Sequence, residues 1–172
     1  MLDTGLSGRV CLVTGAAGGI GNEVANILAS EGAELVLVDI RPGDSPDALW
    51  LGADLRSRGG VEEVMGAVRR EFGRLDVLIH CTGLYRVTPF PDVTDDEWDA
   101  VMDTNTRSAF LLTQAAIPLM QEHGDGRIVL FSSQAAKTGG LASGGVHYVV
   151  SKAGVSGLVR NVAKYAGPLG IR

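Results

Sequence analysis

Two residues with complementary chemistry, Tyr148 and Lys152, lie four positions apart near the C-terminal end of the sequence. Residues four apart share one face of a helix, although many such pairs are only surface contacts. A free tyrosine is a poor base at neutral pH because its pKa is near 10. A positive charge about 4 Å away contributes on the order of 4 kcal/mol toward ionising it, about three pKa units. The pair could therefore transfer the proton that accompanies a hydride transfer between an alcohol and a nicotinamide.

Two hydroxyl groups, those of Ser132 and Ser133, follow the apolar run at residues 127–131. Parallel sheets bind ligands at the carboxyl ends of their strands. If the run is such a strand, a serine at its end can donate a hydrogen bond to a substrate oxygen. The position of the serines thus favours chemistry for the Tyr148 and Lys152 pair over a surface contact.

Three glycines, Gly15, Gly19 and Gly21, follow another apolar run and precede a helical pattern. A glycine cluster alone is a weak signal, because tight turns use glycine for steric reasons. Between a strand and a helix, however, the backbone N–H groups and the helix dipole can bind a pyrophosphate. Gly15 would make the turn, Gly19 would let the backbone approach the phosphates, and Gly21 would let the helix pack on the sheet.

Asp39 stands eighteen residues after Gly21, at the end of a second apolar run. A carboxylate there can accept hydrogen bonds from both ribose hydroxyls and would repel a 2′-phosphate, which favours NAD over NADP. The alternative is a solvated carboxylate at a strand end. Arg41 could weaken the preference for NAD, and we interpret it as a flanking surface residue.

The elements that position these residues follow from hydrophobic periodicity. Apolar runs predict five strands, at residues 9–14, 34–39, 48–53, 75–81 and 127–131. Helical spacing predicts one face made of Ile20, Val24, Ile27 and Leu28 and another made of Val61, Val64, Val68 and Phe72. Thr94 to Glu97 fits a capping box at the start of a third helix. Long helices are expected at residues 105–121, with Pro118 kinking or ending the first, and at 147–166.

Strands and helices are expected to alternate regularly along the chain. Strands that are apolar throughout belong to a parallel sheet with helices on both faces. We therefore predict an α/β fold with a doubly wound, Rossmann-like parallel sheet. At 172 residues, the chain fits one dinucleotide-binding and catalytic domain spanning 1–172.

Composition excludes several classes of function. The formal net charge of −5 and the scattered basic residues argue against a nucleic-acid partner. No apolar run approaches the roughly 18 residues needed to span a membrane, so we expect a cytoplasmic protein. Cys11 and Cys81 lie in predicted strands, where buried reduced thiols are favoured over a disulfide. The three histidines have no metal-ligand spacing, and no metal site is predicted.

The chain resembles the short-chain dehydrogenase/reductase family along essentially its whole length. The resemblance rests on Thr14-Gly15-Ala16-Ala17-Gly18-Gly19-Ile20-Gly21, Asp39, Asp54-Leu55, Asn105, Ser133 and Tyr148-xxx-Lys152. It implies Tyr148 as general acid/base, Lys152 as the group that lowers its pKa and holds the ribose, and Ser133, the second of the two serines, as the substrate-orienting hydroxyl. Asn105 would seat a water in a proton relay. The implied cofactor-binding residues are Thr14, Gly15, Gly19, Ile20, Gly21, Asp39, Asp54, Leu55, Gly83, Tyr148 and Lys152, with Asp54 facing the adenine.

Two departures from the family pattern stand out. After the fourth strand the family usually has Asn-Asn-Ala-Gly, whereas this chain has His80-Cys81-Thr82-Gly83. His80 is either a satisfied buried histidine or an added titrating group. The last residues, Gly170-Ile171-Arg172, resemble the family's entry into a sixth strand. The C-terminal strands and the substrate cover are therefore expected to be missing, leaving the fifth strand as an exposed edge.

The leading functional hypothesis is an NAD-dependent oxidoreductase that acts on a secondary alcohol or the matching ketone. The alternative is a non-catalytic NAD-binding fragment, or a subunit that requires a partner. A third hypothesis, an epimerase or dehydratase, fits the glycine spacing less well. The resemblance also implies a homo-oligomer, a dimer or tetramer paired through the two long helices. Residues 83–86 and 134–147, which would line the substrate pocket, are mostly small and uncharged and leave the substrate undefined.

Overall fold

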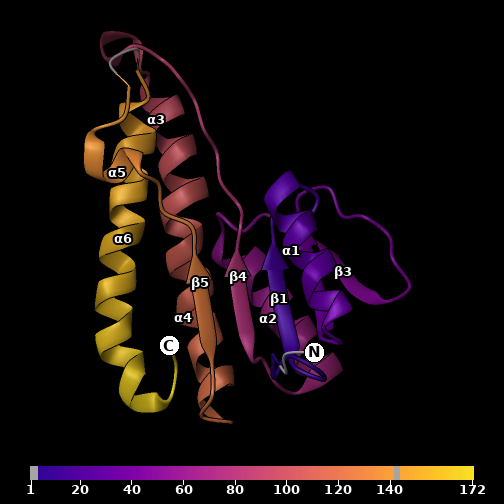
Figure 1. Cartoon of the computed structure of the whole chain (residues 1–172). Coiled ribbons are helices and arrows are strands. Elements are labelled where there is room, and N and C mark those ends of the chain that lie inside the picture. Colours follow the sequence, from indigo (N-terminus) through magenta and orange to yellow (C-terminus); the bar gives the residue numbers. More distant parts are fainter. Residues whose placement is uncertain (1–3, 142–143) are drawn as a thin grey trace.

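The computed structural model describes residues 4–141 and 144–172. Five parallel strands form one sheet in the order β3-β2-β1-β4-β5 (Figure 1). The strands are β1 Val10–Thr14, β2 Glu34–Asp39, β3 Ala48–Gly52, β4 Val77–His80 and β5 Arg127–Leu130. The helices are α1 Gly19–Ser30, α2 Arg58–Phe72, α3 Asp95–Met102, α4 Ser108–Gln121, α5 Ala135–Thr138 and α6 Val146–Ala166, with short turns η1 Phe90–Asp92, η2 Asp103–Arg107 and η3 Gly167–Leu169.

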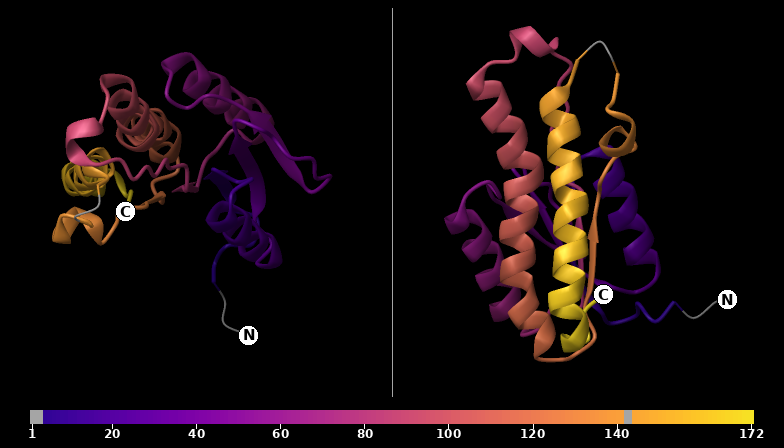
Figure 2. Two further views of the ribbon diagram at one scale, coloured as in Figure 1. Left: turned by 90° about the horizontal axis from the view of Figure 1, so that it is seen from above. Right: turned by 90° about the vertical axis from the view of Figure 1, so that its left-hand side faces the viewer.

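The two faces of the sheet bury separate hydrophobic clusters. Val10 and Leu12 of β1 pack with residues of α2 and α4, whereas Cys11 and Val13 pack with residues of α1. Helices therefore cover both faces, and α4 and α6 lie side by side near β5 (Figure 1, Figure 2). Because both sides of β1 are buried, its sequence is apolar throughout rather than alternating. The predicted doubly wound parallel α/β sheet is confirmed.

Two predictions about the first half of the chain need correction. Strands and helices do not alternate throughout, because β2 and β3 are joined by residues 40–47 without a helix. The predicted buried face of α1 is also only partly right, since Ile20 and Ile27 are each 61% exposed. The buried residues of α1 are Gly21, Ala25 and Leu28. At Gly21 the backbone of α1 lies so close to the backbone of the glycine turn that no side chain fits between them.

The helical stretch before β5 differs from the predicted helix at residues 105–121. α3, the π-helical turn η2 and α4 follow one another without a break. Pro118 lies inside α4, which continues to Gln121 rather than ending at the proline. A π turn inserts an extra residue into the helix, and such turns are frequent at functional sites. η2 contains Asn105, so the irregular turn coincides with a predicted site residue.

The ends of two strands also differ from expectation. Cys81 lies just beyond β4 rather than inside a strand, and both cysteines are free thiols. The outer edge of β5 is partly paired: the Ile128 N–H donates to the Arg172 carbonyl over 2.8 Å, and the Arg172 N–H donates to the Gly126 carbonyl over 3.0 Å. The predicted exposed edge is thus only partly right, because Arg172 pairs with the first half of β5 while Val129 is 45% exposed. Among the described helices, none is long and apolar enough to cross a membrane.

Candidate active site

The glycine turn between β1 and α1 is held by close backbone contacts. Gly15 has φ +64°, and a Cβ there would lie 2.9 Å from the Thr82 nitrogen. A Cβ on Gly21 would lie 2.2 Å from the Gly15 carbonyl oxygen, closer than any real contact. A Cβ on Gly19, in contrast, would meet nothing within 4 Å. Gly15 and Gly21 are therefore required by the packing, and Gly19 faces open space where a phosphate group could approach the backbone.

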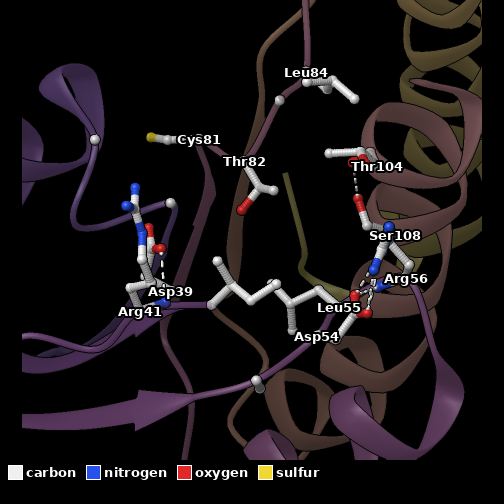
Figure 3. Close-up of a pocket in the computed structure, with 15 residues that line it drawn as sticks. Asp39, Arg41, Asp54, Leu55, Arg56, Cys81, Thr82, Leu84, Thr104 and Ser108 are labelled. Atoms are coloured by element: carbon white, nitrogen blue, oxygen red, sulfur yellow. Dashed lines mark hydrogen bonds and ion pairs between the residues drawn. The ribbon is translucent and has the colours of Figure 1, made fainter. Parts of the chain in front are cut away.

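A cavity of about 470 Å³ lies at the carboxyl ends of the strands, beside this turn. Asp39 and Arg41 lie at one end of it, and Asp54, Leu55 and Arg56 lie on another wall (Figure 3). The remaining lining residues are Gly15, Gly18, Ile40, Ala53, Cys81, Thr82, Gly83, Leu84, Thr104 and Ser108. Five of the predicted cofactor residues, Gly15, Asp39, Asp54, Leu55 and Gly83, thus line one space.

The two carboxylates of this cavity are bound differently. Asp39 accepts hydrogen bonds from the Ala17 and Arg41 backbone N–H groups, each over 3.2 Å, so the carboxylate is oriented by main chain. Asp54 forms an ion pair with Arg56 over 2.7 Å. The Arg56 side chain holds the pKa of Asp54 below its ordinary value, against the effect of burial. Within the described residues Asp39 forms no ion pair, whereas the charge of Asp54 is compensated by Arg56.

His80 is the centre of a directional hydrogen-bond chain below the cavity. The Ser108 hydroxyl donates to the Thr104 carbonyl over 2.5 Å and must therefore accept from His80 Nε2, 2.9 Å away. His80 Nδ1 then carries no proton and accepts from the Thr14 hydroxyl over 2.7 Å, while Thr14 Oγ1 accepts from the Thr82 hydroxyl over 3.0 Å. Burial lowers the pKa of His80 to about 3, with a smaller effect from Lys152. His80 is thus a satisfied, neutral buried histidine.

Asn105 connects three parts of the chain from the π turn η2. Its Oδ1 accepts from the Leu84 N–H over 2.6 Å, and its Nδ2 donates to the Leu84 carbonyl and to Ser151 Oγ, each over 2.9 Å. The residue is only 1% exposed. Asn105 therefore fixes the chain that follows β4 against the first turns of α6.

Lys152 lies in α6 and is buried next to Phe131, the residue that follows β5. Its Nζ donates to the Phe131 carbonyl over 2.8 Å and lies 5.8 Å from the centre of the Tyr148 ring. Burial lowers the pKa of Lys152, because a desolvated ammonium is less stable. A Cβ on Gly83 would lie 3.6 Å from the Lys152 Nζ, so the ammonium lies close to Gly83, which lines the 470 Å³ cavity.

Tyr148 and Ser133 line a second cavity, of about 270 Å³. Ser133 Oγ accepts a 3.2 Å hydrogen bond from the Ala135 N–H and donates to no side chain within the described residues, so its own proton is available to a ligand. Ser132 instead donates to the Lys152 carbonyl over 2.9 Å and contacts Ser156 Oγ at 2.7 Å. The two adjacent serines thus have different surroundings, and Ser133 is the one that faces a cavity with Tyr148.

Several residues of the site were not singled out from the sequence. Ser108 and Ser151 each complete a buried hydrogen bond, to His80 and to Asn105. Tyr85 lines the second cavity and packs edge-on against Tyr148, with the ring centres 4.7 Å apart. Ser151 could have been found, because it lies three residues after Tyr148 on the same helical face. Nothing in the local sequence indicates the partner of Ser108.

The comparisons with known proteins agree with this geometry. Residues 9–172 match the family model described as short chain dehydrogenase. The chain is 36% identical to D-threitol dehydrogenase of Mycolicibacterium smegmatis, over 99% of this chain and 69% of that protein. It superposes with a TM-score of 0.92 and 30% identity on a short chain dehydrogenase from Leptospira borgpetersenii with bound NAD+, over 100% of this chain and 72% of that one.

A third similar protein is the ligand-free aldohexose dehydrogenase of Thermoplasma acidophilum, with a TM-score of 0.91 and 27% identity. The match covers 98% of this chain and 65% of that chain. The chain therefore spans about two-thirds of the length of these similar proteins. The family model, the relatives and the fold agree, and the chain belongs to the short-chain dehydrogenase family.

Proposed function

We propose that this chain is the cofactor-binding and catalytic part of an NAD-dependent oxidoreductase that interconverts a secondary alcohol and a ketone. The observation that carries the proposal is the arrangement of Tyr148 and Ser133 around the 270 Å³ cavity. Lys152 is buried next to Tyr148 and lies close to Gly83 of the 470 Å³ cavity, called the larger cavity from here on. This arrangement supplies a proton-transfer group, a hydrogen-bond donor for the substrate and a fixed cation in one place.

The residues of the larger cavity fit a dinucleotide. Gly19 leaves open space at the start of α1, where backbone N–H groups and the helix dipole favour a pyrophosphate. The oriented Asp39 carboxylate can accept from ribose hydroxyls and would repel a 2′-phosphate, which supports NAD over NADP. The NAD+ bound to the similar Leptospira protein supports the same choice. Thr14 and Ile20 remain proposed cofactor contacts.

Each catalytic residue would have a separate task. In the oxidation direction, the tyrosinate of Tyr148 accepts the hydroxyl proton of the substrate while the carbinol carbon loses its hydride and becomes a ketone carbon. NAD, when bound, supplies the acceptor of that hydride. The Lys152 ammonium, whose Nζ lies 5.8 Å from the centre of the Tyr148 ring, would stabilise the tyrosinate, and Ser133 would donate a hydrogen bond to the substrate oxygen. Asn105 holds the backbone around them and would seat the relay water.

The substrate class is proposed from two similar proteins. One is a D-threitol dehydrogenase and another is an aldohexose dehydrogenase, and both names denote polyhydroxylated compounds. The second cavity is lined by Tyr85, Ser133, Ala135, Gly140, Leu141, Gly144, Gly145, Tyr148 and Val149. No charged side chain is in this set, which favours a neutral substrate. We therefore propose small polyols and sugars as the first compounds to assay.

The alternative is an NAD-binding protein without turnover. It is favoured by one observation: the second cavity holds only about 270 Å³, at the low end for a ligand site. We also propose, from the family resemblance, a homo-oligomer paired through α4 and α6, where Phe110 and Val159 are exposed. A single domain over 1–172 and a cytoplasmic location, which suits the two free thiols, complete the proposal.

Substitution of Tyr148 by Phe separates the two functions. The variant should lose at least a thousandfold in turnover of D-threitol or a related polyol with NAD, because the proton acceptor is gone. Its NADH dissociation constant, measured by fluorescence titration, should stay within twofold. Tyr165→Phe is the matched control, because Tyr165 is on the same helix and 67% exposed. If the wild type binds NADH but neither it nor the Tyr148 variant turns over any compound of the panel, the non-catalytic alternative stands.

A further inference from the structure

Glu97 on α3 makes contacts that its place in a capping box does not explain. The Thr94 side chain accepts from the Glu97 N–H, as the capping box predicts. The Glu97 carboxylate, however, reaches away from Thr94. Its Oε1 accepts from the Thr88 hydroxyl over 2.6 Å and lies 3.0 Å from His147 Nε2. Because a carboxylate only accepts, His147 donates through Nε2–H.

His147 is the second residue of α6, directly before Tyr148, and its side chain is fully buried. Within residues 4–141 and 144–172, its Nδ1 has no hydrogen-bond partner. The Glu97 contact is thus the interaction that compensates the burial of this imidazole. The hydrogen bonds from Thr88 and then from His147 hold the pKa of Glu97 below its ordinary value, so the carboxylate is charged.

The backbone of the segment that contains Thr88 also contacts the start of α6. The Gly145 N–H donates to the Thr88 carbonyl over 3.1 Å. A Cβ on Gly144 would lie 2.3 Å from that carbonyl oxygen, and Gly144 and Gly145 have φ +138° and +91°. Residues 84–94, here called the strap, therefore press against the α6 N-terminus so closely that only glycine fits. Figure 2 shows α6 beside the continuous helical stretch formed by α3 and α4. The strap leads into the start of α3.

Two anchors, at Leu84 and at Thr88, fix the first part of the strap. Leu84 is held by Asn105 through both its N–H and its carbonyl, and Thr88 is held by Glu97 and Gly145. Between these anchors lies Tyr85, whose ring packs edge-on against Tyr148. The position of Tyr85, and with it one wall of the 270 Å³ cavity, thus depends on the anchor at Thr88.

We propose that Glu97 and His147 form a positioning pair that fixes the strap across the start of α6 and so sets Tyr85 against Tyr148. Neither residue touches the reacting atoms. Their effect on turnover rests on the proposed function, whereas their effect on the two tyrosine rings does not. The pair would act on substrate placement, because neither Glu97 nor His147 lines the 470 Å³ cavity.

The test uses the full chain with ¹³C-labelled tyrosine and NADH as the probe ligand. The sequence has three tyrosines, and the exposed Tyr165 provides an internal reference. Glu97→Ala and Thr88→Val should shift the ring signals of Tyr85 and Tyr148 and speed amide exchange at Gly145 at least tenfold. The NADH dissociation constant should change less than twofold. In Glu97→Gln, an amide oxygen still accepts both hydrogen bonds, and the ring signals should return most of the way to wild type.

Asp96→Asn is the matched control, because it removes a carboxylate from the same exposed helical turn. With any compound that the wild type turns over, Glu97→Ala should raise KM about tenfold and lower kcat less than threefold. Unchanged tyrosine signals in both Glu97→Ala and Thr88→Val overturn the proposal, as does an equal response of Asp96→Asn. If Glu97→Ala does not fold, Thr88→Val and Glu97→Gln decide. If the ring signals of Tyr85 and Tyr148 shift in the variants but the wild type turns over no compound, the proposed function is rejected and the positioning pair is still supported.

Discussion

The glycine turn and the start of α6 are held in place by different kinds of contact. In the turn, the main chain of Gly15 and Gly21 packs where even a Cβ has no room. At the start of α6, hydrogen bonds that Asn105 and Lys152 donate, and one that Glu97 accepts from His147, fix the chain. The first region therefore couples cofactor binding to folding at these two positions, because an atom added at Gly15 or Gly21 disturbs both. In the second, the proposed chemistry of Tyr148 and its structural support belong to different residues and can be separated.

Gly21→Ala should have the largest effect of the substitutions considered. The added Cβ would lie 2.2 Å from the Gly15 carbonyl oxygen, so α1 must move away from the turn. We expect a loss of about 3 kcal/mol in the free energy of unfolding, typical of strong overpacking, and at least a hundredfold weaker NADH binding. Urea unfolding and fluorescence titration measure the two quantities.

Gly19→Ala is the matched control for this coupling. Its Cβ meets nothing within 4 Å, so the free energy of unfolding should not fall. NADH binding should still weaken, because the methyl group enters the space proposed for the phosphates. If both variants bound NADH equally well, or both lost stability equally, the distinction between packing glycines and a ligand-facing glycine would be wrong.

Asn105→Ala should have the next largest effect, at the start of α6. It removes three hydrogen bonds, one buried and two partly buried, and leaves the Leu84 N–H and carbonyl unpaired, at a cost of about 2 kcal/mol. Ser151→Ala removes only one of these bonds and should cost about 1 kcal/mol. Turnover should fall in both variants more than NADH binding does, since the larger cavity keeps its glycine turn. Equal losses of binding and turnover in Ser151→Ala would contradict the separation argued for this region.

Much of the fold could be predicted from local sequence because its signals are strong. The β1, β2 and α2 residues form apolar runs or stripes, and their burial follows directly: Val36, Val64 and Val68 are fully buried. The face of α1 could not be predicted by hydrophobicity, since Gly21 and Ala25 face the core while Ile20 and Ile27 are exposed. There the limit is the distance between two pieces of backbone, which periodicity does not report.

The site divides in the same way. Residues whose role depends on a strand end or on helical spacing, such as Asp39 and the Tyr148 and Lys152 pair, could be placed near the cavities from sequence. Contacts between segments far apart in the chain could not. The Glu97 to His147 contact spans 50 residues, and the His80 to Ser108 contact spans 28. Each residue alone fits an ordinary role, so nothing local indicates its partner.

A substitution of His80 tests whether the stability of the region around the glycine turn also depends on a side chain. The unfolded chain gains a proton at His80 below pH 6.5, whereas the folded chain resists it down to about pH 3. The unfolded state therefore binds more protons in this window, and stability must fall as pH drops, by about 1.4 kcal/mol per pH unit. His80→Asn should remove that slope between pH 6 and pH 4, measured by urea unfolding. His123→Asn, at an exposed histidine, should leave the slope unchanged.

Asp39→Asn should have the smallest effect on the fold and should show how the 470 Å³ cavity selects its cofactor. The amide keeps an oxygen that can accept from the Ala17 and Arg41 N–H groups, so the backbone need not move. Only the negative charge is lost, so nothing offsets the attraction of the neighbouring Arg41 for a 2′-phosphate (Figure 3). We expect the ratio of NADH to NADPH affinity to fall about tenfold, which is about 1.4 kcal/mol. Adding Arg41→Ala should restore part of the ratio by weakening NADPH alone. An unchanged ratio in Asp39→Asn would mean that this carboxylate acts by orienting the glycine turn through Ala17 and does not select the cofactor by charge.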